Sequence, residues 1–228
     1  METLGTIYGG WDIPIMANLN EKSIVYSGGV GEDISFDLKL SDKYNCNIFL
    51  IDPTKKSIKH FDNVQKYYNT YGYIFMENIQ PDYIKHISNL KPNFDKFTYL
   101  NKGLHNKRGT LKFYKQSNPS YVSQSLVPNM FGNEYDIVEV DTIKNIMTKF
   151  GHTKIDLLKL DIEGSEIHVL EQMLDDKIFP KYLCIEFDLA LKRKDCTNST
   201  QKIIERLQLN GYTILVNKNL NITFEYKL

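Results

Sequence analysis

Features that often reveal the class of a protein are scarce in this sequence of 228 residues. It has no net charge, because 28 lysines and arginines balance 28 aspartates and glutamates. Such a chain has no overall attraction to phosphate backbones or anionic lipid surfaces. It also lacks any apolar run as long as a membrane span. We therefore expect neither a nucleic acid nor a membrane as its partner.

Cysteine is scarce as well. The three cysteines, Cys46, Cys184 and Cys196, are widely spaced and odd in number, which fits neither a disulfide framework nor a zinc site. The first residues, METLGTIYGGWDIP, lack the basic start and the apolar core of a signal peptide. These observations favour a reduced, cytoplasmic protein.

Strand-like and helix-like segments alternate along the chain, which favours a parallel sheet with helices on both faces. The last two strand candidates, YTILV and ITFEYKL, are separated only by NKNLN, which is too short for a helical crossover. They are therefore predicted to pair antiparallel. Because no shift in composition marks a linker, we expect residues 1–228 to form a single domain. Asp141 and Ser199 are predicted to cap the helices that follow them.

Residues 101–135 interrupt this alternation. They are polar, rich in glycine and proline, and contain two short extended runs, TLKFY and YVSQSL. Long irregular connections in compact domains tend to serve a binding site, so we predict a hairpin or lid here. A surface excursion without a role in the site is the alternative.

A glycine-rich turn follows the first strand of the alternating region. In YSGGVGEDISF, Gly28, Gly29 and Gly31 precede a helix, where they allow positive φ and let a ligand approach free backbone N–H groups. Asp52 ends the next strand, about twenty residues further on, where an acid meets the ribose of an adenosine cofactor. Pro53 then fixes the turn. This pattern predicts a nucleoside-binding site.

The acids Glu32 and Asp33 narrow the choice of cofactor. They occupy the place of the last glycine in the dinucleotide fingerprint, and acid at a helix start repels a pyrophosphate. A cofactor with a positive centre and an amino group is tolerated there. The residues therefore favour S-adenosylmethionine over a nicotinamide dinucleotide.

A row of charge marks the fourth strand, in IDLLKLDIEGSEIHVLEQML. Lys159, Asp161 and Glu163 alternate with apolar residues, and Lys159 is expected to pair with Asp161 or Glu163. The carboxyl ends of parallel strands form the binding crevice of an open sheet, so these charges should border a polar pocket. Glu186 ends the neighbouring strand. Clustered carboxylates suit a general base for an alcohol and would equally bind a divalent cation, and the sequence does not decide between the two.

Together these stretches resemble the FkbM-type methyltransferases. The likeness is carried by VYSGGVGEDISFDLKL, FLIDPTKKS, YVSQSL and above all DLLKLDIEGSE, and it extends over nearly the whole chain. It implies a class I methyltransferase (Rossmann-like) α/β fold, in which helices sandwich a mostly parallel seven-stranded sheet with an antiparallel C-terminal hairpin. It also implies S-adenosylmethionine as methyl donor and an oxygen acceptor, often on a sugar or secondary metabolite.

The resemblance and the strand ends together define the expected site. Asp161 and Glu163 are the expected proton acceptors, and Glu186 is expected to shape the acidic pocket. Tyr121 and Ser123 in YVSQSL are expected to face the acceptor, with His105 as a weaker candidate. The donor is expected to contact Gly28, Gly29, Gly31, Glu32, Asp33, Asp52, Pro53, Gly103, Leu104 and Asp161.

One departure from the class I pattern concerns the methionine end of the donor. Many class I enzymes carry an acid on the first strand just before the glycines, and this chain has Tyr26 and Ser27 there. Glu32, Asp33 or Asp161 are the candidates for that role. The sequence thus predicts an O-methyltransferase that acts on a small molecule or saccharide. A catalytically silent subunit that binds the donor is the alternative from another class.

Overall fold

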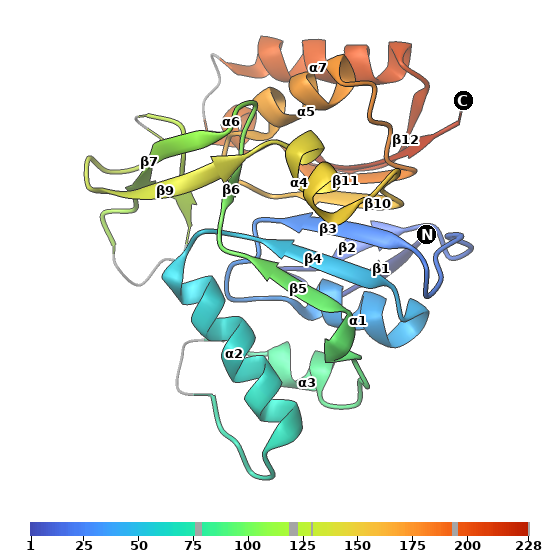
Figure 1. Ribbon diagram of the computed structural model, residues 1–228, viewed down its shortest axis with the longest axis vertical. Coiled ribbons are helices and arrows are strands. Elements are labelled where there is room, and N and C mark those ends of the chain that lie inside the picture. The colour runs from blue at the N-terminus through green and yellow to red at the C-terminus, as the bar shows by residue number, and fades with distance from the viewer. Residues whose placement is uncertain (76–78, 119–122, 129, 193–195, 228) are drawn as a thin grey trace.

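The computed structural model describes residues 1–75, 79–118, 123–128, 130–192 and 196–227. Its largest sheet has seven strands: β3 (Ile24–Gly28), β4 (Asn47–Ile51), β5 (Phe97–Leu100), β10 (Leu157–Leu160), β11 (Tyr182–Glu186), β12 (Tyr212–Lys218) and β13 (Asn221–Tyr226). They are ordered β12-β13-β11-β10-β3-β4-β5 (Figure 1). The strands from β11 to β5 in this order run parallel, and β13 pairs antiparallel with both β11 and β12. This topology confirms the class I α/β fold with an antiparallel C-terminal pair of strands.

Helices cover both faces of this sheet. The helices are α1 (Ser35–Tyr44), α2 (Lys55–Asn69), α3 (Tyr83–Ile87), η1 (Phe94–Lys96), α4 (Ile143–Phe150), α5 (Glu166–Asp175), α6 (Asp188–Lys192) and α7 (Thr197–Leu209). Side chains of β4 alternate between two apolar cores: Ile48 and Leu50 pack with α1, α2 and α3, whereas Phe49 and Ile51 pack with α4, α5 and α7. The sheet is therefore buried on both faces, as a parallel sheet requires.

The N-terminal caps of helices α4 and α7 differ from those predicted from the sequence. Thr142, not Asp141, caps α4, because its hydroxyl accepts a hydrogen bond from Asn145 N at 3.1 Å. Asp141 ends the preceding strand, and its carboxylate accepts from Thr142 N instead. Helix α7 begins at Thr197, so Ser199 lies within its first turn and is not its cap.

The described part of the segment 101–135 contributes to a second, four-stranded sheet, which is more than the predicted hairpin. Its strands are β6 (Gly103–Leu104), β7 (Gly109–Lys115), β8 (Gln124–Ser125) and β9 (Tyr135–Asp141), in the order β6-β9-β7-β8. The sheet lies beside the carboxyl ends of the main parallel strands (Figure 1). The segment extends beyond residue 135 because β9 pairs with β7 from Tyr135 to Val140.

A short N-terminal hairpin was not foreseen from the sequence. Strands β1 (Glu2–Leu4) and β2 (Trp11–Ile13) pair antiparallel, and Thr223 on β13 donates to the carbonyl of Asp12 at 2.7 Å. The hairpin thereby brings its tip, with Tyr8 and Gly9, to the pocket described below. Among the described helices, none has the length and apolar character that crossing a membrane requires.

Candidate active site

The glycine turn after β3 lies directly against the loop after β10. Gly29 has φ +77° and Gly31 has φ +60°, both in the left-handed region that favours glycine. A Cβ on Gly29 would lie 1.6 Å from the carbonyl oxygen of Asp161, so no side chain fits at this position. The bare backbone of Gly29 therefore lets the two loops meet at the carboxyl edge of the sheet.

Asp52 holds this turn in place. Its buried carboxylate accepts hydrogen bonds from Val30 N at 2.9 Å, Gly31 N at 3.1 Å and Thr54 N at 2.7 Å. The sequence predicts a contact between this carboxylate and a ribose. A carboxylate offers about four lone-pair positions, so capacity remains for a further donor after three N–H groups. Asp52 thus organises the turn and borders the same pocket.

The two acids after the glycines have different surroundings. Asp33 is buried, and its carboxylate accepts from Thr6 Oγ1 at 2.5 Å and from Ser35 N at 2.9 Å. It therefore ties the N-terminal hairpin to the start of α1. Glu32 is partly exposed and borders the pocket. Glu32 is accordingly the more accessible of the two to a ligand.

A pocket opens where β3, β4 and β10 end. Its lining includes nine of the ten residues predicted to contact a donor, namely Gly29, Gly31, Glu32, Asp33, Asp52, Pro53, Gly103, Leu104 and Asp161. Gly28 is the exception. It is the last residue of β3, and a Cβ there would lie 2.7 Å from the Leu104 side chain, so Gly28 makes room for packing and does not line the pocket.

Lys159 lies beneath this pocket, on the α1 face of the sheet. It is 3% exposed, and its Nζ donates to Gly29 O at 2.5 Å and lies 3.6 Å from Asp161 Oδ2. Burial disfavours its charged form, but the carboxylates of Asp161 and Asp37 raise the pKa of Lys159 above its ordinary value. The predicted pairing with Asp161 is therefore confirmed. The alternative partner, Glu163, pairs with another lysine.

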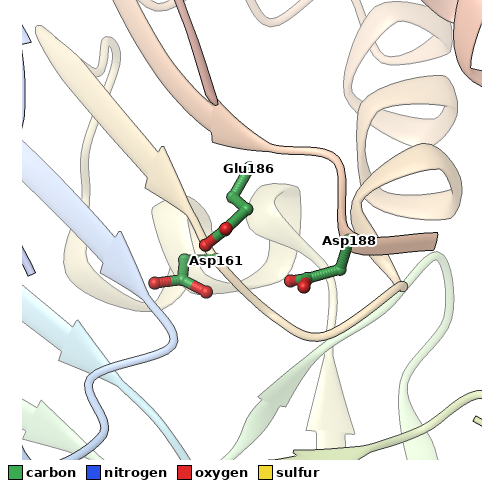
Figure 2. A group of neighbouring side chains, drawn as sticks. All are labelled: Asp161, Glu186 and Asp188. Atoms are coloured by element: carbon green, nitrogen blue, oxygen red, sulfur yellow. The ribbon is translucent and has the colours of Figure 1, made fainter. Parts of the chain in front are cut away.

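A second pocket adjoins the first and is strongly acidic. The two share Tyr8, Glu32, Ser123, Asp161 and Glu163. Asp161, Glu186 and Asp188 converge in the second pocket, and one carboxylate oxygen from each lies within 4.8 Å of the others (Figure 2). Burial and then the charge of Asp161 raise the pKa of Glu186 to about 8, and burial and then Glu163 raise the pKa of Asp188 to about 7. The sequence prediction that clustered carboxylates raise one another's proton affinity is confirmed for these two groups.

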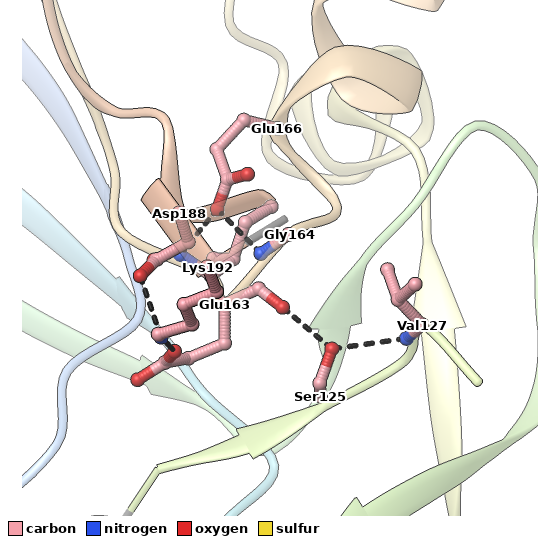
Figure 3. Close-up of polar contacts among 8 residues, drawn as sticks. Ser125, Val127, Glu163, Gly164, Glu166, Asp188 and Lys192 are labelled. Carbon is pink, nitrogen blue, oxygen red and sulfur yellow. Dashed lines mark hydrogen bonds and ion pairs between the residues drawn. The ribbon is translucent and has the colours of Figure 1, made fainter. Parts of the chain in front are cut away.

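Glu163 belongs to a network that joins three elements. The ammonium of Lys192, on α6, forms ion pairs with Glu163 and with Asp188 Oδ1, the latter at 2.6 Å (Figure 3). The backbone of Glu163 has φ +56°, and its carbonyl accepts from Ser125 Oγ at 2.5 Å. Strand β8 of the second sheet is therefore linked directly to the acidic loop after β10.

Glu166 stabilises that loop from below. Its fully buried side chain accepts hydrogen bonds at Oε1 from Ile162 N and Gly164 N, each at 3.0 Å (Figure 3). Burial and the nearby Asp188 raise the pKa of Glu166 well above its ordinary value. Its carboxyl thus holds the backbone between Asp161 and Gly164 in a defined shape.

The residues predicted to contact the methyl acceptor lie in different places. Ser123 lines both pockets, as expected of a residue near the acceptor. Tyr121 lies outside the described residues. His105 is absent from the described lining of either pocket: its ring lies 5.7 Å from that of His168, and burial lowers its pKa. The structure therefore does not bring His105 to the acidic pocket, because β6 directs the chain toward β9 and α5.

Four residues of the site were given no role from the sequence: Tyr8, Glu166, Asp188 and Lys192. Asp188 lies two residues after the end of β11, so its position near a strand end was a signal, whereas Tyr8 lies in a short N-terminal stretch to which no site was assigned. Lys192 left none, because only the packing of α6 brings it to Glu163.

The fold and the pocket define this chain as a class I α/β protein of the methyltransferase type, with its binding crevice at the carboxyl ends of the parallel strands. The chain belongs to the methyltransferase FkbM domain family, whose model matches residues 30–214. Among solved structures it is similar to the fibrillarin pre-rRNA processing protein of Methanococcus jannaschii. The identity is 11%, the match covers 95% of this chain and 72% of that chain, and the TM-score is 0.44. No curated protein sequence gives a significant match.

Proposed function

We propose that this protein is an S-adenosylmethionine-dependent O-methyltransferase that methylates a hydroxyl group of a small molecule or saccharide. One observation carries the proposal: two adjoining pockets share Asp161. The first has the glycine turn and Asp52, which suit an adenosine cofactor. The second is lined by carboxylates, which suit an acceptor that must lose a proton.

The charges of the first pocket favour this donor. S-adenosylmethionine carries a positive sulfonium and an amino group, and the pocket presents the partly exposed acids Glu32 and Asp161. Asp33, the third candidate for the methionine end, is buried and therefore less accessible to a ligand. Glu32 and Asp161 are thus the better partners for the donor's amino group.

Methyl transfer needs alignment first and a proton acceptor second. The acceptor oxygen attacks the methyl carbon, the carbon–sulfur bond breaks, and S-adenosylhomocysteine leaves with the electron pair. A well-oriented pair of reactants can gain roughly 7–11 kcal/mol, whereas general-base help adds about 10²–10⁴-fold in rate. Asp161 is the first choice for the base because it borders both pockets, while Glu163 is ion-paired with Lys192.

A screen of hydroxylated small molecules and saccharides for production of S-adenosylhomocysteine tests the function. Once an acceptor is found, Asp161→Asn is expected to lower turnover about 10²–10⁴-fold. Glu163→Gln should lower it less, and Asp62→Asn, on the exposed face of α2, should leave it unchanged. Wild-type turnover in both acid variants would place the base elsewhere. Donor binding without S-adenosylhomocysteine from any acceptor would favour the silent donor-binding subunit.

A further inference from the structure

Three acids meet at the ends of two neighbouring strands. Asp161 directly follows β10, Glu186 ends β11 and Asp188 opens α6. Because β10 and β11 pair in parallel, their carboxyl ends lie side by side. Figure 2 shows the three carboxylates pointing toward one another, and one oxygen of each lies within 4.8 Å of the others. The fold therefore places three hard oxygen ligands around one point.

A second observation comes from Asp188 itself. This side chain is 4% exposed, and its Oδ1 is paired with Lys192. Its Oδ2 is buried and has no hydrogen-bond partner within the described part of the chain. A buried carboxylate oxygen without a partner is strongly unfavourable, and this one belongs to a carboxylate directed at Glu186 and Asp161 (Figure 2).

The charges of the cluster also favour a bound cation. Among the described residues, two ammonium groups contact it, those of Lys159 and Lys192. Besides Glu32 at the edge of the same pocket, the described carboxylates are those of Asp161, Glu163, Glu186 and Asp188. When all are ionised, two negative charges remain without compensation by these lysines. One divalent cation would neutralise them.

We propose that Asp161, Glu186 and Asp188 form a binding site for a divalent cation of the hard, oxygen-liganded type, such as Mg²⁺, Mn²⁺ or Ca²⁺. Three oxygens spaced evenly around Ca²⁺ at its usual ligand distances would be about 4.0–4.5 Å from one another, and around Mg²⁺ about 3.5 Å. The separations in the cluster do not exceed 4.8 Å, so a modest contraction would bring the three oxygens to such distances.

The position of this site would place a bound cation in contact with the acceptor. All three acids line the second pocket, so the cation would lie beside the acceptor and not beside the glycine turn. Three protein ligands leave coordination positions open for water or for oxygens of a ligand. An acceptor with neighbouring hydroxyl groups would be favoured, because two of its oxygens can occupy two of these positions.

Titration of the EDTA-treated full chain with Mn²⁺, followed by electron paramagnetic resonance of the free ion, tests the proposal without donor or acceptor. The wild type should bind one Mn²⁺. Asp188→Asn and Glu186→Gln, which preserve side-chain shape, should each weaken binding at least about tenfold. Asp175→Asn, a surface acid paired with Arg206, is the matched control and should bind as the wild type does. Circular dichroism confirms that each variant is folded.

Lys192→Met should strengthen Mn²⁺ binding, which is the opposite of the effect expected for the two acid variants. Removing this ammonium deprives Asp188 and Glu163 of their positive partner, so Mn²⁺ should bind severalfold more tightly. The proposal is overturned if the wild type binds no Mn²⁺, if the two acid variants bind as tightly as the wild type, or if Lys192→Met weakens binding. With a cation bound, Asp161 serves as its ligand in place of the proton acceptor proposed above, while the proposed methyl transfer does not itself depend on the cation. Absence of Mn²⁺ binding in a wild type that still binds S-adenosylmethionine would overturn the cation site alone.

Discussion

The two pockets that share Asp161 are held in different ways. The first is built from backbone: the glycine turn lies against the Asp161 carbonyl, and Asp52 is held by three N–H groups of the turn and of α2. The second is built from charged side chains, and among the residues that the structure describes its carboxylates outnumber the lysines that contact them. The first is therefore ordered by the protein alone, and the second carries charge that a proton, a cation or a ligand must balance.

This difference matches what each pocket would bind. A donor of constant structure suits a rigid backbone cradle, because pre-organisation lowers the entropy that binding must offset. A reaction that releases a proton suits a pocket of clustered carboxylates, in which Glu186 and Asp188, each with a raised pKa, lie beside the proposed base Asp161. The comparison predicts that changes to the first pocket act mainly through geometry and changes to the second mainly through charge.

Gly29→Ala should have the largest effect. The new Cβ would collide with backbone, the Asp161 carbonyl, and the loops cannot separate without disrupting both pockets. We expect a loss of more than about 4 kcal/mol in the free energy of unfolding, together with loss of donor binding. Gly72→Ala is the matched control, since Gly72 has a similar φ of +74° with nothing within 4 Å of its added Cβ. It should cost about 1–2 kcal/mol. Equal effects in urea unfolding would refute the close approach.

Removal of Glu166 should have the next largest effect. Glu166→Ala leaves two buried N–H groups, of Ile162 and Gly164, without an acceptor, which costs about 2–6 kcal/mol in total. Glu166→Gln keeps an oxygen acceptor for both N–H groups in a side chain of the same size, so it should cost clearly less than Glu166→Ala. Glu171→Ala, on the exposed side of the same helix, serves as the control for urea unfolding. A Gln variant as unstable as the Ala variant would contradict this account.

A smaller effect, which depends on pH, is expected from Asp37, which lies beneath the first pocket. It concerns the free energy of unfolding. Burial raises its pKa from 3.8 to about 6, although Lys159 opposes the rise and Asp33 adds to it. The folded state therefore keeps a proton that the unfolded chain has lost between about pH 4 and pH 6, so stability falls as pH rises through that window. The loss amounts to at most about 3 kcal/mol. In Asp37→Asn the difference in unfolding free energy between pH 4 and pH 7 should shrink accordingly; an unchanged difference would contradict a buried, titrating Asp37.

Much of the fold could be predicted from the sequence. The parallel strands are short apolar runs, and those other than β5 are followed by helical spacing, so local pattern and tertiary structure agree there. The N-terminal hairpin and β9 were missed because they depend on distant partners. In YDIVEVD the charges of Asp136 and Glu139 interrupt the apolar pattern, and β7 supplies the pairing.

The site could be predicted where it depends on strand ends. Gly29, Asp52 and Asp161 directly follow parallel strands, so topology alone brings them to one edge of the sheet. Gly28 was misplaced because one residue in the register decides whether a glycine lines the pocket or packs against Leu104. His105 was misplaced because the path of a short strand after a loop has no sequence signature.

The central claim is that the first pocket binds S-adenosylmethionine through the glycine turn and Asp52. Calorimetric titration with S-adenosylmethionine tests it most directly, using the wild type, Asp52→Ala and the exposed control Asp62→Asn. The account predicts saturable binding by the wild type. Binding should be at least about tenfold weaker in Asp52→Ala, because each charge-assisted hydrogen bond contributes roughly 1.5–3 kcal/mol. It should be unchanged in Asp62→Asn. Absence of binding in the wild type, or equal affinity in Asp52→Ala, would contradict it.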